Sequence, residues 1–263
     1  MRVSRLRRYP VKSMLGEDLD AAEFTPSGLT GDRGLALVDT ETGRVATAKH
    51  PRRYRDLLQC AAAFTAAGVR VTLPGGRTIT PDEVGVQVSG LLGREVVLTA
   101  RRPAGAEVER PAPEDVIAAG VEAEVPFATL EIAQGTPGES FVDYAPVHLI
   151  TTATLDRLGT EAIRYRPNIV VEGGQEAFVE NGWVGREIAV GEVVLRGVLP
   201  TPRCSVPTLA HGDLPLRPDA VRPLMRDNRV DVPGFGTLPC AGLYAEVLRA
   251  GTVRDGDEVR IAG

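Results

Sequence analysis

Cysteine, aromatic residues and long apolar runs are scarce in this chain of 263 residues, and each scarcity excludes a class of protein. The three cysteines are Cys60, Cys204 and Cys240, and none lies within a few residues of another. Zinc ribbons and iron–sulfur clusters need such close spacing, and three cysteines cannot all pair. The sequence therefore predicts no iron–sulfur cluster of its own, no zinc ribbon and no structural disulfide.

Aromatic residues make up 5% of the chain, which has 29 glycines and 20 prolines. Such a composition favours short elements joined by turns and argues against a helical bundle. With 43% hydrophobic and 25% charged residues, the chain can bury the core of one large domain or two small ones.

No stretch approaches the ~18 apolar residues that span a bilayer, and the basic N-terminal segment lacks the apolar part of a secretory signal. The net charge of -5 gives no electrostatic footprint for nucleic acid or an anionic membrane. We therefore expect a cytoplasmic protein that binds neither nucleic acid nor a membrane. Lys12 and Lys49 are the only lysines, so each is more informative than a single arginine in this arginine-rich chain.

Turn residues and alternating apolar residues predict the secondary structure. In the first half they predict two β-hairpins, 35–39 with 44–49 and 69–73 with 77–80, then a strand within 91–99 and a loop or linker at 101–114. In the second half they predict helices at 152–158 and 218–228 and strands at 168–172, on both sides of Gly191 within 187–198, and within 243–261. The sequence thus predicts a mainly β protein with short helices (α+β), with a partly closed barrel that hides strand edges.

Cys204 is the first candidate for chemistry, because it follows a predicted strand and stands next to Arg203. A nearby positive charge favours the thiolate, which is the form that acts as a nucleophile or binds a soft metal. Taken alone, a buried structural cysteine is the more common interpretation.

Two further groups of residues are suited to binding an anion. Residues 164–168 place two arginines and Asn168 before an apolar strand, and guanidinium groups bind phosphate or carboxylate. Residues 9–13 and 31–34 combine cations, a hydroxyl group and glycines whose backbone amides can approach a phosphate. Each pattern is common, and a solvated loop explains it equally well.

Other catalytic patterns are absent from the sequence. His50, His148 and His211 lack the spacing of a helical metal pair, although His148 or His211 could meet Cys204 in space. The sequence contains no Walker loop, no dinucleotide-binding glycine motif after a strand and no nucleophile elbow.

Several of these segments, taken in order, resemble the MOSC-domain family. The segments are 9–13 (YPVKS), 31–33 (GDR), 141–143 (FVD), 147–151 (VHLIT), 166–170 (RPNIV), 183–185 (WVG), 188–191 (IAVG), 203–204 (RC), 242–244 (GLY) and 251–257 (GTVRDGD). The resemblance covers nearly the whole chain. It implies an N-terminal MOSC-associated β-barrel domain at 1–105, packed on a MOSC β-barrel domain at 106–263.

The resemblance also implies a cofactor. MOSC proteins similar to the mitochondrial amidoxime-reducing component and to bacterial reductases of N-hydroxylated compounds bind molybdenum cofactor, a molybdopterin whose dithiolene holds the metal. Cys204 matches the cysteine that ligates molybdenum in that family. The matches to cofactor-binding positions are Lys12, Ser13, Arg33, Arg166, Asn168 and Arg203. A soft metal and an anionic cofactor call for a thiolate and several cations, which agrees with the chemistry of these residues.

The chain departs from the family pattern in two places. After Asp143 it has Tyr144 and Ala145 where relatives place small hydroxyl residues, so only backbone amides could replace one of those donors. Segment 234–241 ends in Cys240 and Ala241, whereas relatives reach the following strand without a cysteine. Cys240 is expected either in the core or as a second thiol near the metal.

The leading hypothesis is a molybdenum-dependent reductase of N-hydroxylated or N-oxygenated small molecules, with Cys204 as the metal ligand. Its electrons are expected from a separate electron-transfer protein of ferredoxin or flavoprotein type, because the predicted closing strands reach the last residues. One alternative is a sulfur carrier or cofactor carrier that uses a Cys204 persulfide. Another is a metal-free thiol enzyme on the same fold.

Overall fold

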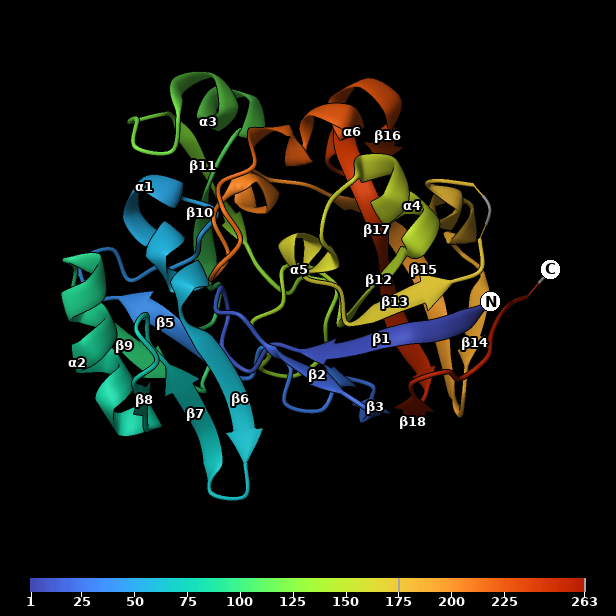
Figure 1. Cartoon of the computed structure of the whole chain (residues 1–263), viewed down its shortest axis with the longest axis horizontal. Coiled ribbons are helices and arrows are strands. Elements are labelled where there is room, and N and C mark those ends of the chain that lie inside the picture. Colours follow the sequence, from blue (N-terminus) through green and yellow to red (C-terminus); the bar gives the residue numbers. More distant parts are fainter. Residues whose placement is uncertain (175, 263) are drawn as a thin grey trace.

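Short strands make up most of the regular secondary structure in the computed structural model, which describes residues 1–174 and 176–262 (Figure 1). The mainly β, α+β fold with short helices is confirmed. The strands are β1 (Arg2–Arg8), β2 (Glu17–Leu19), β3 (Ala21–Thr25), β4 (Gly28–Leu29), β5 (Ala36–Asp39), β6 (Ala61–Thr65), β7 (Gly68–Thr72), β8 (Thr78–Ile79), β9 (Val96–Thr99), β10 (Glu107–Pro111), β11 (Phe127–Glu131), β12 (Val147–Thr151), β13 (Ile169–Glu172), β14 (Glu187–Val190), β15 (Val193–Pro202), β16 (Arg229–Val232), β17 (Gly236–Arg249), β18 (Gly251–Arg254) and β19 (Val259–Ile261). The helices are α1 (Pro51–Tyr54), α2 (Pro81–Leu92), α3 (Pro113–Ala119), α4 (Thr152–Leu158), α5 (Ala162–Tyr165) and α6 (Arg222–Asp227), with 3-10 turns η1 (Arg55–Gln59), η2 (Val179–Trp183), η3 (Val206–Thr208) and η4 (Pro218–Ala220).

The largest sheet joins strands from the two ends of the chain. Its order is β19-β14-β15-β17-β12-β13-β1-β2, so β1 lies beside β13 (Figure 1). A bridge between Arg2 and Glu258 connects β1 to the start of β19, and Val259 N donates to Met1 O at 2.8 Å. These contacts close the sheet into a barrel, which leaves few exposed edges.

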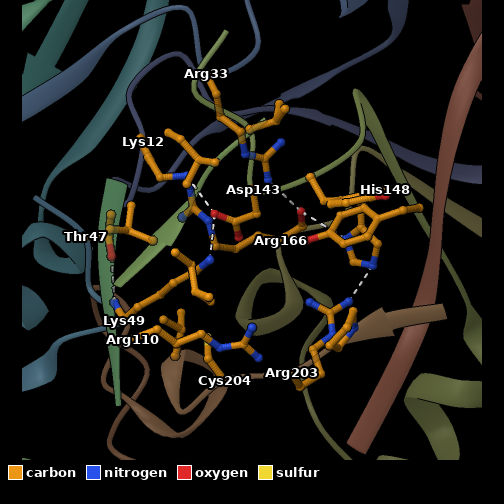
Figure 2. Close-up of a pocket in the computed structure, with 18 of the residues that line it drawn as sticks. Lys12, Arg33, Thr47, Lys49, Arg110, Asp143, His148, Arg166, Arg203 and Cys204 are labelled. Atoms are coloured by element: carbon orange, nitrogen blue, oxygen red, sulfur yellow. Dashed lines mark hydrogen bonds and ion pairs between the residues drawn. The ribbon is translucent and has the colours of Figure 1, made fainter. Parts of the chain in front are cut away.

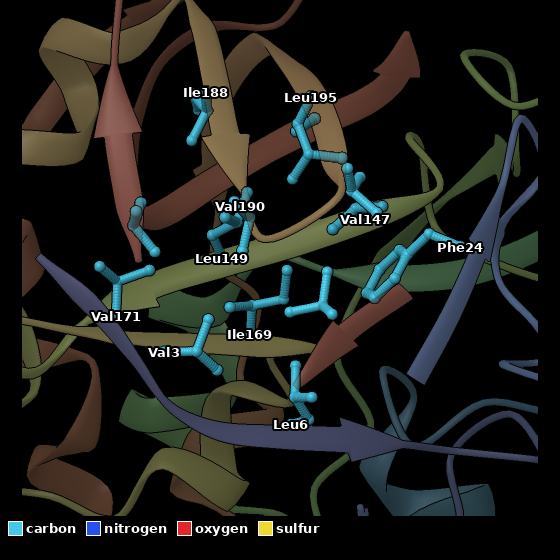
Figure 3. Packing of buried hydrophobic residues seen from close by; sticks show 14 of the residues in the cluster. Val3, Leu6, Phe24, Val147, Leu149, Ile169, Val171, Ile188, Val190 and Leu195 are labelled. Atoms are coloured by element: carbon cyan, nitrogen blue, oxygen red, sulfur yellow. The ribbon is translucent and has the colours of Figure 1, made fainter. Parts of the chain in front are cut away.

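The barrel interior is filled by alternate aliphatic residues of its strands (Figure 3). Leu149 of β12, Ile169 of β13 and Ile188 of β14 are fully buried there. Successive side chains of a strand point to opposite faces, so every second residue enters the core. Burying such a side chain stabilises the fold by about 1.5–3 kcal/mol. Phe24 of β3 packs into the same cluster, so the N-terminal segment completes this core.

The remainder of the first half forms a smaller unit with its own core. Here β6-β7-β8 and β5-β9 are separate small sheets, and α2 packs against β9 and β7 (Figure 1). The predicted hairpin at 69–73 and 77–80 is confirmed by the pairing of β7 with β8. The other predicted hairpin is only partly right, because 44–49 contributes a single bridge, Val45 to Val38, and the ladder partner of β5 is β9.

The strand predicted within 91–99 is confirmed as β9, but helix α2, which ends at Leu92, was not predicted. Thr80 and Glu83 form a capping box at the start of that helix. The prediction of a loop or linker at 101–114 is wrong. The predicted linker at 101–114 contains β10, which pairs with β11 along its whole length. Val108 and Glu109 of β10 are buried, so the proline and charge content of this segment misled the prediction.

Predictions for the second half agree better with the structure. Helix α4 has the predicted bounds, β13 begins one residue late, and β14 and β15 lie on either side of Gly191. The predicted helix at 218–228 consists of η4 and α6, and β17 begins at Gly236, earlier than expected. The boundary between 1–105 and 106–263 stays a prediction. No helix among the described residues has the length and apolar character needed to cross a membrane.

Candidate active site

One pocket brings together the seven residues predicted to hold the cofactor and its metal (Figure 2). Arg164, the other arginine of the predicted cluster, does not line it and donates instead to Leu209 O and Pro215 O, both at 2.8 Å. Figure 2 shows Lys12 and Arg33 on one side and Arg203 and Cys204 on the opposite side. The predicted residues that line the pocket are Lys12, Ser13, Arg33, Arg166, Asn168, Arg203 and Cys204. They come from the loop after β1, the turn after β4, the α5–β13 junction and the end of β15.

Three of these residues hold an uncommon backbone conformation. Ser13, Arg33 and Arg166 have φ values of 65°, 46° and 56°, in the left-handed region that favours glycine. Such a conformation costs roughly 1–2 kcal/mol for a residue with a Cβ. Strained backbone gathered around one pocket is typical of a functional site.

Two guanidinium groups lie over the ring of buried Tyr9. The Cζ atoms of Arg33 and Arg166 are 4.8 Å and 4.3 Å from the ring centroid. Arg33 Nη2 donates to the carbonyl of Arg166 at 3.0 Å, and Arg166 Nη1 donates to Met14 O at 2.7 Å. Arg166 Nη2 is buried and has no hydrogen-bond partner among the described residues. A buried donor without a partner is costly, so this nitrogen is suited to binding an anion in the pocket.

Burial and the neighbouring guanidinium of Arg33 lower the pKa of Arg166 to about 10. Arg166 is therefore charged at neutral pH.

Lys12 and Lys49 both bind the carboxylate of Asp143. The Lys12 Nζ is 2.7 Å and the Lys49 Nζ 2.9 Å from Asp143 Oδ1, and Lys12 also donates to Phe141 O at 2.6 Å. Burial lowers the pKa of Lys12 to about 8, against the opposing effect of Asp143. Although burial opposes its ionisation, the two ammonium groups hold the pKa of Asp143 well below its usual range.

Positive charge predominates in the pocket although the chain as a whole carries a net charge of -5. The acidic lining residues are Glu131 and Asp143, against six basic ones. Converging cations of this kind favour an anionic ligand. The basic lining residues are Lys12, Arg33, Lys49, Arg110, Arg166 and Arg203.

Cys204 is the partly exposed thiol in the chain, and it follows directly after β15. Cys60 and Cys240 are buried, and burial raises the pKa of each thiol to about 11. Cys240 therefore belongs to the core, where it packs with Leu199 and Val232. Of the three thiols, Cys204 is the one that lines the pocket.

The Arg203 guanidinium is hydrogen-bonded to the backbone of two distant segments. Its Nε donates to Ala241 O and its Nη1 to Tyr165 O, both at 2.9 Å. Its Nη2 lies 2.5 Å from His148 Nε2. These neutral partners fix the position of the guanidinium and leave its charge in place, so the predicted effect of that charge on the Cys204 thiolate stays a prediction. Through these contacts Arg203 also fixes the segment that carries Cys204.

The side chains of Asn168 and His148 are likewise hydrogen-bonded within the fold. Asn168 Oδ1 accepts from His148 N at 3.1 Å, and its Nδ2 donates to Arg7 O at 3.3 Å. Burial and the charge of Arg203 lower the pKa of His148 well below its usual value, so the ring is neutral. The possible pairing of His148 with Cys204 is replaced by its contact with Arg203.

The structure adds residues to the site that sequence reasoning did not assign. Lys49 and Asp143 belong to the ion-pair cluster, and the rarity of lysine was the available signal for Lys49. Arg110 lines the pocket from β10, which the sequence placed in a linker. Tyr144, Phe235 and Tyr244 supply an aromatic side to the pocket.

Comparison with known proteins tests the predicted resemblance. Residues 1–89 match the MOSC N-terminal beta barrel domain, and residues 138–260 match the MOSC domain. Mitochondrial amidoxime reducing component 2 of Rattus norvegicus is 29% identical over 98% of this chain and 82% of that protein. Mitochondrial amidoxime-reducing component 1 of Homo sapiens is 24% identical over 99% of this chain and 83% of that protein.

Among solved structures, the YUAD protein from Bacillus subtilis is 12% identical with a TM-score of 0.44, covering 99% of this chain and 94% of that one. The two domain matches occur in the predicted order, and the relatives match along nearly the full chain. The chain therefore belongs to the MOSC family, with a MOSC N-terminal barrel followed by a MOSC domain, and is a distant homologue of the mitochondrial amidoxime-reducing components.

Proposed function

We propose that this protein is a molybdenum-cofactor-dependent reductase that removes oxygen from N-hydroxylated or N-oxygenated small molecules. The observation that carries the proposal is the pocket, in which one partly exposed thiol faces an excess of positive charge. The names of the relatives support the reaction class, because they describe amidoxime-reducing components.

The residues present fit the cofactor chemically. A thiolate is a suitable ligand for a soft metal, and one protein thiol suffices when a dithiolene brings further sulfurs. The cofactor is anionic, and the pocket offers Lys12, Arg33 and Arg166 together with the unpartnered Arg166 Nη2. A persulfide carrier needs the thiol but gives no reason for this concentration of cations.

In this proposal the residues of the pocket have three roles: metal binding, cofactor binding and positioning. Cys204 binds the metal, while Lys12, Ser13, Arg33 and Arg166 hold the anionic part of the cofactor. Arg203 and Asn168 position these groups through their contacts with the backbone. The bound cofactor supplies the two-electron redox chemistry. We also propose that a separate ferredoxin or flavoprotein delivers the electrons, as the family resemblance implies.

Metal content and activity test the proposal together. Protein from a host that makes molybdenum cofactor should carry close to one molybdenum per chain and reduce an amidoxime with an artificial electron donor. Cys204→Ala should lose most of both, because it removes the proposed metal ligand. Cys60→Ala removes a buried thiol outside the pocket and should retain both.

A Cys204→Ala enzyme of undiminished activity contradicts the proposal. Metal-free protein that releases sulfur on treatment with cyanide supports the sulfur-carrier hypothesis instead.

A further inference from the structure

An aromatic wall forms one side of the pocket, and the family comparison assigns it no role. The wall is defined as Phe235, Tyr144 and Tyr244, all of which line the pocket. The ring centroids of Tyr144 and Phe235 are 5.7 Å apart at 83°, and those of Tyr144 and Tyr244 are 6.2 Å apart at 36°. The ring of His148 follows at 5.8 Å from Tyr244 and contacts Arg203. Through His148, the wall is therefore in contact with Arg203, the residue that precedes Cys204.

Phe235 lies at the tip of the β16–β17 hairpin, and the base of this hairpin contacts the segment that carries Cys204. β16 and β17 pair from Arg229 with Pro239 to Val232 with Gly236, so Phe235 lies in the short connection between them. At the base of this hairpin, Arg203 N donates to Pro239 O at 2.8 Å. β17 therefore connects the hairpin that carries Phe235 with the segment that carries Cys204.

Phe235 is also partly exposed to solvent. It is 37% exposed although it lines a pocket. Gly234 and Gly236, with φ values of 80° and 77°, form the turn that presents it. An aromatic side chain exposed at a pocket is available to pack against a ligand ring.

Tyr144 is better anchored than Phe235. Its backbone carbonyl accepts from Thr136 Oγ1 at 2.7 Å and from Gly135 N at 3.1 Å. Tyr144 and Tyr244 both line the pocket, so their hydroxyl groups add polar atoms to its aromatic side. The pocket thus combines a cationic part, built by Lys12, Arg33 and their neighbours, with an aromatic part that carries polar hydroxyls.

We propose that Phe235 and Tyr144 determine substrate specificity by selecting N-hydroxylated compounds whose reactive group is attached to a flat aromatic ring. The identity of the reactive group as an N-hydroxylated group rests on the proposed reductase function. The preference for an aromatic ring does not, because it rests on the aromatic wall alone. Edge-to-face and offset packing of aromatic rings favours a planar ring over a saturated ring of the same size. Phe235 is a substrate-binding residue in this proposal. Its substitution should therefore leave metal binding by Cys204 unchanged.

Binding without turnover tests the inference. The holoenzyme, with no electron donor present, is titrated calorimetrically with benzamidoxime and with cyclohexanecarboxamidoxime, which differ in the ring alone. We expect the wild-type protein to bind the aromatic compound about threefold to tenfold more tightly. Phe235→Ala and Phe235→Leu should lose most of that preference. Phe64→Ala removes a phenylalanine of similar exposure, 39%, that lies outside the pocket and should keep it.

Unchanged molybdenum content in the Phe235 variants will show that the site remains intact. If wild type and Phe235→Ala discriminate equally between the two compounds, the specificity proposal is wrong even when both are reduced. If the aromatic preference depends on Phe235 but adding an electron donor reduces neither compound, the specificity proposal stands and the reductase proposal fails.

Discussion

Lys12 has a buried ammonium group that titrates close to neutral pH, since burial lowers its pKa to about 8. A bound dianion favours the protonated form, so above about pH 8 binding must take up a proton. Anion affinity should therefore fall as the pH rises above that value. We expect a loss of at least about tenfold, because a hydrogen bond to a charged group contributes roughly 1.5–3 kcal/mol. Calorimetric titration with sulfate, whose own charge is constant in this range, measures it.

The matched variant is Lys12→Met. It should bind sulfate more weakly than wild type at neutral pH and lack the decline in affinity above about pH 8. If the sulfate affinity of Lys12→Met falls equally above about pH 8, another group titrates there and the prediction for Lys12 is wrong.

Single residues were predictable from the sequence where their type was rare or where they lay in a segment that resembles the MOSC family. Lys12 and Cys204 stand out because the chain has so few lysines and cysteines, and both line the pocket. Arg110 is one arginine among many and could not be distinguished. The role of Arg203 was also beyond the sequence, because its partners, such as Tyr165 O and Ala241 O, come from distant segments.

At the scale of elements, Gly242 allows β17 to pass close to β12. Its φ is +81°, and a Cβ there would overlap His148 Nε2 and Leu149 O. Gly242→Ala should therefore destabilise the protein by more than the roughly 1–2 kcal/mol of left-handed strain alone. It should also displace His148 from Arg203 and reduce molybdenum retention. Urea unfolding and metal analysis measure the two effects.

Gly68→Ala is the control for backbone strain. Gly68 has φ +95° with open space around its Cβ position, so its substitution adds strain without a clash. It should cost roughly 1–2 kcal/mol and leave the molybdenum content unchanged. Equal effects of the two substitutions on metal content would show that the approach of β17 to His148 is unimportant for the site.

Elements defined by local signals were predicted better than those defined by distant pairing. The threonine before α4 and the turn at Gly191 are local, and both predictions are confirmed. The pairing of β5 with β9 and the burial of β10 depend on segments elsewhere in the chain. Helix α2 was missed although Thr80 and Glu83 carried its capping signal.

The whole molecule depends on contacts between the two ends of the chain. β1 pairs with β13 across Leu6 and Ile169, and β3 pairs with β18. No local pattern in the sequence indicates partners so far apart. The pocket is divided in the same way, with Lys12, Ser13 and Arg33 on the first part of the chain and Arg166, Asn168, Arg203 and Cys204 on the second.

Residues 106–263 produced alone should therefore fail to fold, although they contain the whole region that matches the MOSC domain. They lack β1, whose absence leaves β13 as an exposed edge prone to aggregation. They also lack Val3, Leu6 and Phe24, which fill the barrel core. Circular dichroism and NMR of this fragment should show an unfolded or aggregated chain, whereas the full protein should give the spectra of a folded chain. Coexpression with residues 1–105 should restore folding by supplying the missing strands. A fragment that folds cooperatively by itself would show that the barrel closes without β1 and that the N-terminal strands serve mainly to complete the pocket.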